Sequence, residues 1–402
     1  MSHNRPLFSI VIPTRNRAYL LRYALQSALD QTFEDYEIIV SDNCSADDTA
    51  QVVKELSTPK VRYVRADKPL SMPDHWEFAL DKARGQYITY LCDDDALHPD
   101  VLKRVDSTIA KYGSSLIVLG SAIYYGDNWL DPTRRNCVAT LSYTGRTREC
   151  DSRDTLTDLF KCLDTYDAPR MQNSFCHRDL ISQLQAQYER IFLLIPDYSF
   201  AAFSLASVPK WTYIDEPLRL QGVFAQGIGA TTLCNRGTPF QGFVQEFGRI
   251  SLLERVPLKI PVTTNFIAEA LLMVKERVGA KLADFEINWE YYFFGCWERI
   301  LIQENFGVGV ETDKEEFFRV LAGQPEGVQS RVRAFMKGAA TSHPLKRVAR
   351  TIINSSSLLM RLESIVRSPK NIVVYGKEAG FSDILECARQ LHTLLSRKVS
   401  SS

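Results

Sequence analysis

Four short apolar segments, each but the last followed by a stretch with helical periodicity, fill the first hundred residues. This alternation limits the fold more than any other feature of the chain. We predict strands at residues 7–12, 36–41, 61–65 and 87–92, with helices at 20–29, 49–56 and 73–84 between them. Strand–helix alternation at this spacing predicts an α/β fold, a mainly parallel sheet flanked by helices on both faces.

The alternation stops near residue 240, and helical patterns dominate from there on. Because 402 residues exceed one ordinary hydrophobic core, we expect two domains. The predicted division is an α/β domain over residues 1–238 and a mostly α-helical C-terminal domain over residues 239–402. A short strand or helix start at 372–375 and a helix from 382 to 395 close the pattern.

Composition excludes several classes of protein. Lys plus Arg and Asp plus Glu number 48 each, so overall charge gives no indication of nucleic-acid binding. Nine cysteines stand apart, without CxxC pairs or Cys/His ligand spacing, as is typical of reduced cysteines in a cytosolic protein. We see no signal peptide and no uncharged apolar run of the ~18 residues that a membrane span needs. The expected location is therefore the cytoplasm.

The fourth predicted strand runs directly into three carboxylates, Asp93, Asp94 and Asp95. Ligands of open α/β sheets bind outside the carboxyl ends of the strands. Adjacent carboxylates repel one another less when a divalent cation lies among them, and oxygen ligands suit Mg²⁺ or Mn²⁺. The alternative is a solvated acidic turn with an Asp helix cap, and the triple Asp alone does not decide between the two.

The glycines exclude a nicotinamide dehydrogenase, which the same alternation would otherwise fit. The first glycine of the chain is Gly85, so neither GxGxxG nor GxxxxGK[ST] can follow the first strand. The first strand instead leads to Arg15 and Arg17, and the second ends at Asp42, a carboxylate able to accept a base N–H. The alternatives are surface charge at a helix start for the arginines and, for Asp47 and Asp48 nearby, helix capping.

Three ordered segments resemble the signature of glycosyltransferase family 2. They are FSIVIPTRNR at 8–17, IVSDNCSADDT at 39–49, and the stretch from Gly85 to Pro99. The similarity covers roughly the first 220 residues. It implies the GT-A fold and an inverting transfer of a sugar from a nucleotide-diphosphate donor to an acceptor hydroxyl.

The resemblance also implies roles for individual residues. Asp95 would hold Mn²⁺ or Mg²⁺ on the diphosphate, Asp42 would hold the base, and Asp93 would lie near the ribose or sugar. The full set of residues expected to bind the nucleotide sugar is Pro13, Thr14, Arg15, Arg17, Asp42, Asp93 and Asp94. Two positions depart from the family pattern, because Arg15 stands where an aromatic residue is common and Cys92 where many members carry a further Asp.

A second important stretch covers residues 195–206, where Phe200 to Leu205 predict a buried helix with Pro196-Asp197 at its mouth. Family 2 enzymes place their catalytic carboxylate at the start of such a helix, often as Glu-Asp. The resemblance therefore implies that Asp197 is the catalytic base. An Asp at this position can also be simply a helix cap, and the two roles do not exclude each other.

The C-terminal half has no motif that names a function. It lacks a QxxRW element and membrane spans, which favours a non-processive enzyme. Residues 331–370 hold nine Lys or Arg and one Glu beside an apolar stripe, so they can form a basic helix on an anionic membrane or one docked on its own domain. Residues 225–232, rich in glycine and small side chains, form either a flap over the nucleotide or an ordinary loop.

These patterns together predict a bacterial-type, inverting, non-processive glycosyltransferase of surface polysaccharide or glycolipid assembly. Its partners would be a nucleotide-diphosphate sugar and a saccharide or lipid-linked saccharide acceptor, with peripheral contact at the inner face of the membrane through residues 331–370. No nucleic acid is expected. The alternative is a catalytically silent domain that binds nucleotide sugars or serves as a scaffold.

Overall fold

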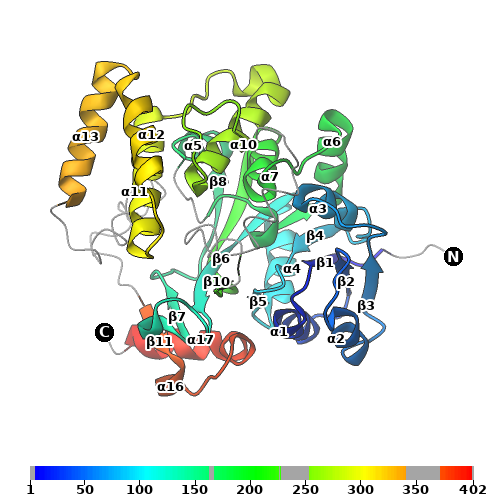
Figure 1. Ribbon diagram of the computed structural model, residues 1–402. Helices are drawn as coiled ribbons and strands as arrows, with labels where there is room; N and C mark the ends of the chain where they lie inside the picture. The colour runs from blue at the N-terminus through cyan, green and yellow to red at the C-terminus, as the bar shows by residue number, and fades with distance from the viewer. Residues whose placement is uncertain (1–4, 163–166, 226, 228–252, 341–371, 401–402) are drawn as a thin grey trace.

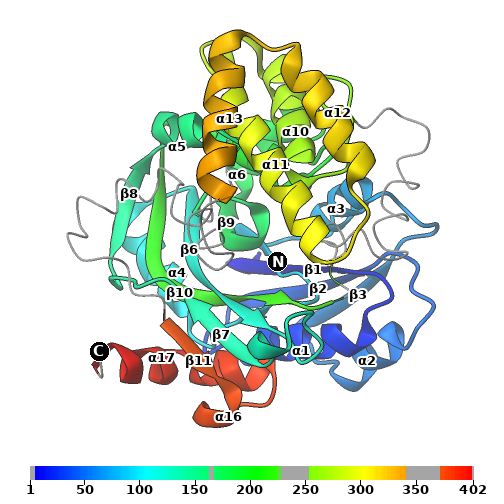
Figure 2. The same cartoon turned by 60° about the vertical axis from the view of Figure 1, so that its left-hand side comes forward.

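The structure is a computed structural model that describes residues 5–162, 167–225, 227, 253–340 and 372–400 (Figure 1). One mixed sheet runs through the molecule, with its strands in the order β11-β7-β6-β9-β4-β1-β2-β3 and β10 pairing with β5, β6 and β8. Helices cover both faces, as Figures 1 and 2 show. The predicted α/β class is confirmed, as is a helical region beyond residue 253.

The strand–helix alternation of the first hundred residues is confirmed. Its elements are β1 (Phe8–Thr14), α1 (Ala18–Leu29), β2 (Tyr36–Asp42), α2 (Thr49–Glu55), β3 (Val61–Arg65), α3 (Met72–Leu80) and β4 (Tyr87–Tyr90). β1 pairs in parallel with β2 and β4, and β2 pairs in parallel with β3. The carboxyl ends of these strands therefore lie along one edge of the sheet.

The other half of the sheet is mainly antiparallel. Its elements are β5 (Ala96–Leu97), α4 (Val101–Tyr112), β6 (Leu116–Tyr125), β7 (Cys137–Thr140), β8 (Thr147–Asp151), α5 (Ser152–Leu159), β9 (Ser174–His177), α6 (Arg178–Tyr188), α7 (Pro196–Leu205) and β10 (Lys210–Val223). β10 runs parallel to β6, with an irregular register between Ile214 and Pro217. Past that irregularity it pairs with β5, directly after the triple Asp.

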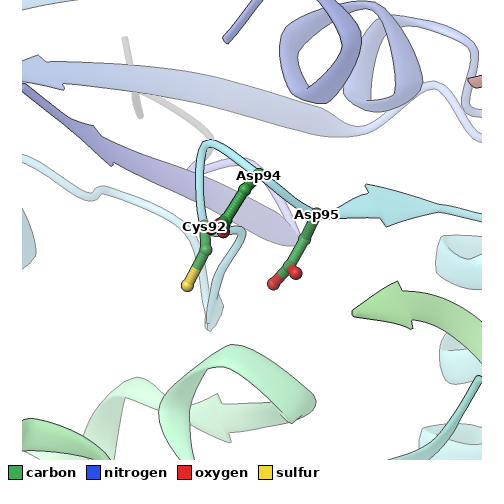
Figure 3. Close-up of side chains that lie close together, drawn as sticks. All are labelled: Cys92, Asp94 and Asp95. Carbon is green, nitrogen blue, oxygen red and sulfur yellow. The ribbon is translucent and has the colours of Figure 1, made fainter. Parts of the chain in front are cut away.

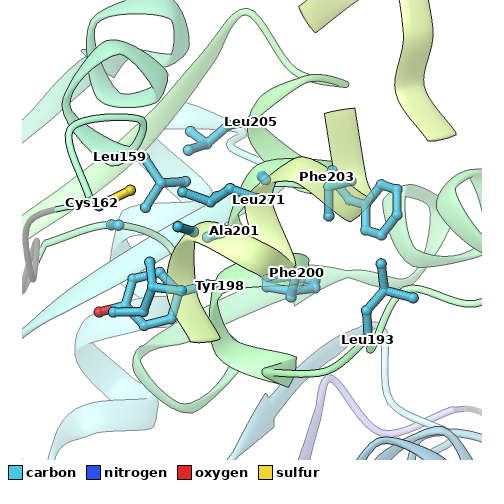
Figure 4. Close-up of a cluster of buried hydrophobic side chains, with 14 of the residues drawn as sticks. Leu159, Cys162, Leu193, Tyr198, Phe200, Ala201, Phe203, Leu205 and Leu271 are labelled. Atoms are coloured by element: carbon cyan, nitrogen blue, oxygen red, sulfur yellow. The ribbon is translucent and has the colours of Figure 1, made fainter. Parts of the chain in front are cut away.

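The helical region packs on the sheet domain through α7. It consists of α10 (Thr263–Val278), α11 (Trp289–Asn305), α12 (Glu311–Ala322) and α13 (Glu326–Ala340). Phe200 of α7 and Leu271 of α10 belong to one buried cluster, which also contains Val11 of β1 (Figure 4). The sheet and the helical region therefore share a hydrophobic core.

The end of the chain returns to the sheet. β11 (Ile372–Tyr375) pairs antiparallel with β7, and α16 (Gly376–Ala379) and α17 (Ile384–Ser400) follow. α17 packs on α1, β5 and β10 (Figures 1 and 2). Residues from the end of the chain thus add a strand to the sheet formed by residues 8–223. None of the helices in the described ranges is both long enough and apolar enough to cross a membrane.

Candidate active site

The carboxyl ends of β1 and β4 meet around the triple Asp. Thr14 Oγ1 donates to Asp93 Oδ2 at 2.8 Å, and Arg17 Nη1 donates to Asp93 Oδ1 at 2.9 Å and Asp94 Oδ2 at 3.1 Å. The charge of Asp93 raises the pKa of Arg17 against the opposing effect of burial. Burial raises the pKa of Asp93, and Arg17 offsets part of that rise. Four of the predicted donor-binding residues therefore form one cluster.

The loops that leave β1 and β2 are tied to each other. Asn16, whose φ of 53° lies in the left-handed region that Asn tolerates, donates its N–H to Ser45 Oγ at 2.9 Å. Its Oδ1 accepts the N–H of Ala46 at 2.7 Å. Asp47 accepts from Ala18 at the start of α1 and from Thr49 at the start of α2, so its role is to hold two helix starts together.

Asp42 is completely buried at the end of β2. Its carboxylate accepts from Ser45 N–H at 2.8 Å, Tyr63 Oη at 2.6 Å and Arg65 Nη1 at 2.6 Å. Sequence reasoning missed Tyr63 and Arg65. Tyr63 and Arg65 alternate on β3, so they share a face, but the strand order that puts β3 beside β2 was not predicted.

A buried histidine lies behind this edge of the sheet. His75 Nε2 is 3.0 Å from Ser41 Oγ, next to Asp42 in sequence. Burial lowers the pKa of His75 to about 4, and the positive charge of Arg15 contributes to the lowering. Arg15 therefore acts on the β2 side of the site, whereas Arg17 contacts the triple Asp.

Asp95 has an ion-pair partner that the sequence analysis did not foresee. Arg219 of β10 donates Nη2 to Asp95 Oδ2, and Gly222 donates its N–H to Asp95 Oδ1 at 2.9 Å. The Asp95 and Arg219 side chains are only 2% and 3% exposed. Burial raises the pKa of Asp95 to about 6, against the effect of Arg219. The sequence signal for this ion pair was Arg219 itself, which stands between Leu218 and Leu220 of an apolar strand, because a buried charge needs a partner of opposite sign.

The donor atoms at this edge fit a divalent cation. Cys92 Sγ and carboxylate oxygens of Asp94 and Asp95 all lie within 4.8 Å of one another (Figure 3). Asp94 is the more accessible carboxylate, with 17% of its side chain exposed. Carboxylate oxygens are the ligands that Mg²⁺ and Mn²⁺ prefer. Arg17 and Arg219 would orient these carboxylates from outside the first coordination sphere.

β10 packs closely against the acidic turn, and this close approach requires glycine at position 222. A Cβ on Gly222 would lie 1.7 Å from the Asp94 carbonyl oxygen, and a Cβ on Gly227 would lie 3.6 Å from Asp94 Oδ2. The segment predicted as a flap therefore begins beside Asp94. Its residues 226 and 228–232 lie outside the described part of the chain.

Asp197 is in the first turn of α7, where Ile195 is the N-cap residue and Pro196 precedes it in the helix. Asp197 is therefore not the N-cap residue. Burial raises the pKa of the Cys92 thiol well above its usual range, and the charges of Asp95, Asp94 and Asp197 raise it further. The charge of Asp197 therefore contributes to the electrostatics of the acidic turn.

Comparisons with known proteins show what the N-terminal part of the chain is similar to. Residues 9–171 match the family described as Glycosyl transferase family 2. A relative from Campylobacter jejuni, named GalNAc(5)-diNAcBac-PP-undecaprenol beta-1,3-glucosyltransferase, is 40% identical over 95 residues, which are 23% of this chain and 31% of that protein. Succinoglycan biosynthesis protein ExoO from Rhizobium meliloti is 31% identical over 113 residues, 28% of this chain and 32% of that protein.

The matched region is thus about a third of the length of these curated relatives. Among solved structures, S. aureus TarS 1-349 in complex with UDP-GlcNAc has a TM-score of 0.48 and 14% identity, covering 82% of this chain and 92% of that one. The family match includes β1, β2 and β4 with the residues at their carboxyl ends. Over this N-terminal region, residues 9–171, the chain is similar to glycosyltransferase family 2.

Proposed function

We propose that the protein is an inverting, non-processive glycosyltransferase that transfers a sugar from a nucleotide-diphosphate donor to an acceptor hydroxyl in surface polysaccharide or glycolipid assembly. One observation carries the proposal. Thr14 and Arg17 at the end of β1, and Asp93 and Asp94 after β4, form a single hydrogen-bonded cluster within the range of the family match.

The donor nucleotide would lie across the ends of β1 and β2. Asp42 keeps lone-pair capacity for a base N–H beside the three donors that fix it, and Pro13 and Thr14 line the neighbouring strand end. Arg15 and Arg17 supply positive charge for the nucleotide phosphates. Asp93, held by Thr14 and Arg17, would face the ribose or the sugar.

Asp95, with Asp94 beside it, would hold Mn²⁺ or Mg²⁺ on the diphosphate. A bound cation offsets the charge that develops on the leaving diphosphate. Arg219 and the Gly222 N–H fix one carboxylate, and Arg17 fixes the other. The chain's own side chains and backbone thus orient both carboxylates.

Asp197 would take the proton of the attacking acceptor hydroxyl. Asp197 lies in the first turn of α7, and its negative charge contributes to the raised pKa of the Cys92 thiol in the acidic turn. A general base must lie near the anomeric carbon on the face opposite the nucleotide. Attack from that face inverts the configuration of the sugar. The acceptor would be a saccharide or a lipid-linked saccharide, consistent with a relative named for a PP-undecaprenol substrate.

We also propose that residues 331–370 bring the enzyme to the inner face of the membrane. Their net charge of +8 is the support for this contact, since each Lys or Arg near an anionic surface contributes about 1 kcal/mol. Residues 341–371 lie outside the described part of the chain. Co-sedimentation with anionic but not neutral vesicles, weakened by salt, would be the expected result.

The decisive experiment is a thermal-shift screen of nucleoside diphosphates and nucleotide sugars, with and without Mn²⁺, followed by detection of released nucleotide. A specific ligand at a hundred times its dissociation constant should stabilise the fold by about 2.7 kcal/mol. Binding accompanied by metal-dependent turnover supports the transferase. Binding without turnover, whether or not acceptors are added, would indicate a catalytically silent domain that binds nucleotide sugars.

A further inference from the structure

A polar cavity lies along α4, lined by residues from Arg104 to Tyr112. Its volume is about 360 Å³. It is lined by one face of α4, with Arg104, Thr108, Lys111 and Tyr112, and by the turn of residues 145–147 that leads into β8. Val101 follows the acidic turn closely, and a helix rises 1.5 Å per residue, so Lys111 lies about 15 Å farther along the axis.

Arg104 is fixed at the floor of this cavity. Its Nε donates to Glu216 Oε2 at 3.1 Å, and its Nη2 donates to Thr147 Oγ1 at 2.9 Å. Its Nη1 donates to Thr108 Oγ1 at 3.3 Å. Glu216 also pairs with His392 of α17 at 3.0 Å. The guanidinium is therefore held by α4, β8 and β10 together, and Glu216 offsets its charge.

Lys111 and Arg146 add two positive charges that are not offset in this way. Both side chains are exposed, and within the described ranges no carboxylate forms an ion pair with either. The residues that line the cavity include hydroxyl groups and no Asp or Glu. Gly145 has a φ of 69° and open space where a Cβ would be, so the turn leaves the mouth of the cavity clear.

Helix chemistry explains only one of these cations. Lys111 is in the last turn of α4, where a positive charge favours the helix dipole, and its Nζ lies 5.2 Å from the centre of the Tyr112 ring. Arg146 belongs to a different element and has no such reason to be there. Two cations from separate elements that line the same cavity as a fixed arginine form an arrangement suited to a phosphate group.

We propose that this cavity binds a phosphate-bearing anion at a site separate from the acidic turn. Lys111 and Arg146 would contact the phosphate oxygens, while Ser107 and Thr147 offer hydroxyl groups at the wall. The volume suits a small phosphate ester or a diphosphate. The phosphate can belong to a soluble molecule or to a lipid headgroup. This inference is independent of the proposed transferase activity.

The test uses the full chain, with a chelator present to remove divalent cations, and titrates inorganic pyrophosphate by calorimetry. We expect saturable binding that weakens about tenfold or more in the double variant Lys111→Gln/Arg146→Gln. The matched control is Lys54→Gln/Lys103→Gln, which removes two exposed helix cations outside the cavity and should leave the affinity unchanged. Equal weakening in both variants, or equal binding in all three proteins, overturns the proposal.

A vesicle arm separates the two sources of phosphate. Co-sedimentation with phosphatidic acid vesicles that depends on Lys111 and Arg146, and is absent with phosphatidylcholine, assigns the site to a lipid headgroup. Pyrophosphate binding through the same two residues without vesicle binding assigns it to a soluble ligand. Wild-type protein that binds neither probe contradicts the site.

Discussion

Two buried carboxylates, Asp95 in the acidic turn and Glu269 in the helical region, have nearly the same burial and different surroundings. They are 2% and 1% exposed. Glu269 accepts from the N–H groups of Arg255 and Val256 and from the Arg255 side chain, so it ties α10 to the segment just before it. Asp95 pairs with Arg219, 124 residues away, and lies beside the partly exposed Asp94.

The comparison shows that burial and ion pairing do not by themselves identify a functional carboxylate. The Glu269 oxygens accept hydrogen bonds from nearby backbone N–H groups and from the Arg255 side chain, as the oxygens of a structural carboxylate do. Asp95 is instead the innermost member of a group of donor atoms, and Asp94 of that group remains partly exposed. A ligand site is indicated where buried and accessible polar groups from distant segments meet.

The largest expected effect comes from Asp95→Ala. The variant should lose the Mn²⁺-dependent part of its affinity for nucleoside diphosphates, measured by titration with and without the metal. It should also lose about 3–5 kcal/mol of unfolding free energy, because Arg219 is left buried without its partner.

Asp94→Ala is the matched control for that variant. It should lose the same metal dependence with a smaller loss of stability, since Asp94 is accessible and Arg17 keeps its bond to Asp93. If the metal dependence of nucleotide affinity survives in both variants, the cation does not bind at the acidic turn.

Glu269→Ala tests the other side of the comparison. Three donors would lose their acceptor, two of them backbone N–H groups, so the unfolding free energy in urea should fall by about 3 kcal/mol. Affinity for nucleoside diphosphates, measured where the variant is folded, should not change. A specific loss of nucleotide affinity would mean that the helical region contributes to the site.

Asp197→Asn separates catalysis from helix stabilisation. Asn cannot accept a proton at neutral pH, so transfer should slow by at least about a hundredfold, which corresponds to about 2.7 kcal/mol. Melting temperature and donor affinity should stay close to wild type, because a first-turn carboxylate contributes only about 0.3–1 kcal/mol to a helix. Near-normal turnover with chemistry rate-limiting would make Asp197 structural.

The smallest expected effect is the acid sensitivity due to His75. Its pKa is about 4 in the folded protein, below the usual 6.5, so the unfolded chain takes up a proton first as the pH falls. This contribution to stability is therefore complete above pH 6.5 and declines by about 2 kcal/mol by pH 5. In urea unfolding at pH 6.5 and pH 5, His75→Gln should remove that share of the pH dependence of the unfolding free energy. An unchanged pH dependence in the variant would contradict this assignment to His75.

The sequence predicted the elements and part of the site. Strand–helix alternation is a local pattern, so β1 to β4 were predictable, and the ends of parallel strands must meet, which brought Thr14 and Asp93 together. Arg219 was not predicted as the partner of Asp95, because nothing local specifies a contact across 124 residues. The strand at 372–375 was predicted as a strand or helix start, but its partner β7 was not, for the same reason.

The return of β11 to the sheet has a consequence for the order in which the protein can be completed during synthesis. About 235 residues separate the end of β7 from the end of β11, and Arg389 bonds to Asp30 across 359 positions. At roughly 5–20 residues per second, a ribosome needs about 12–47 seconds to make that interval. Throughout that time the outer edge of β7 lacks its native partner and can pair with another nascent chain, so truncation before residue 372 would make this exposure permanent.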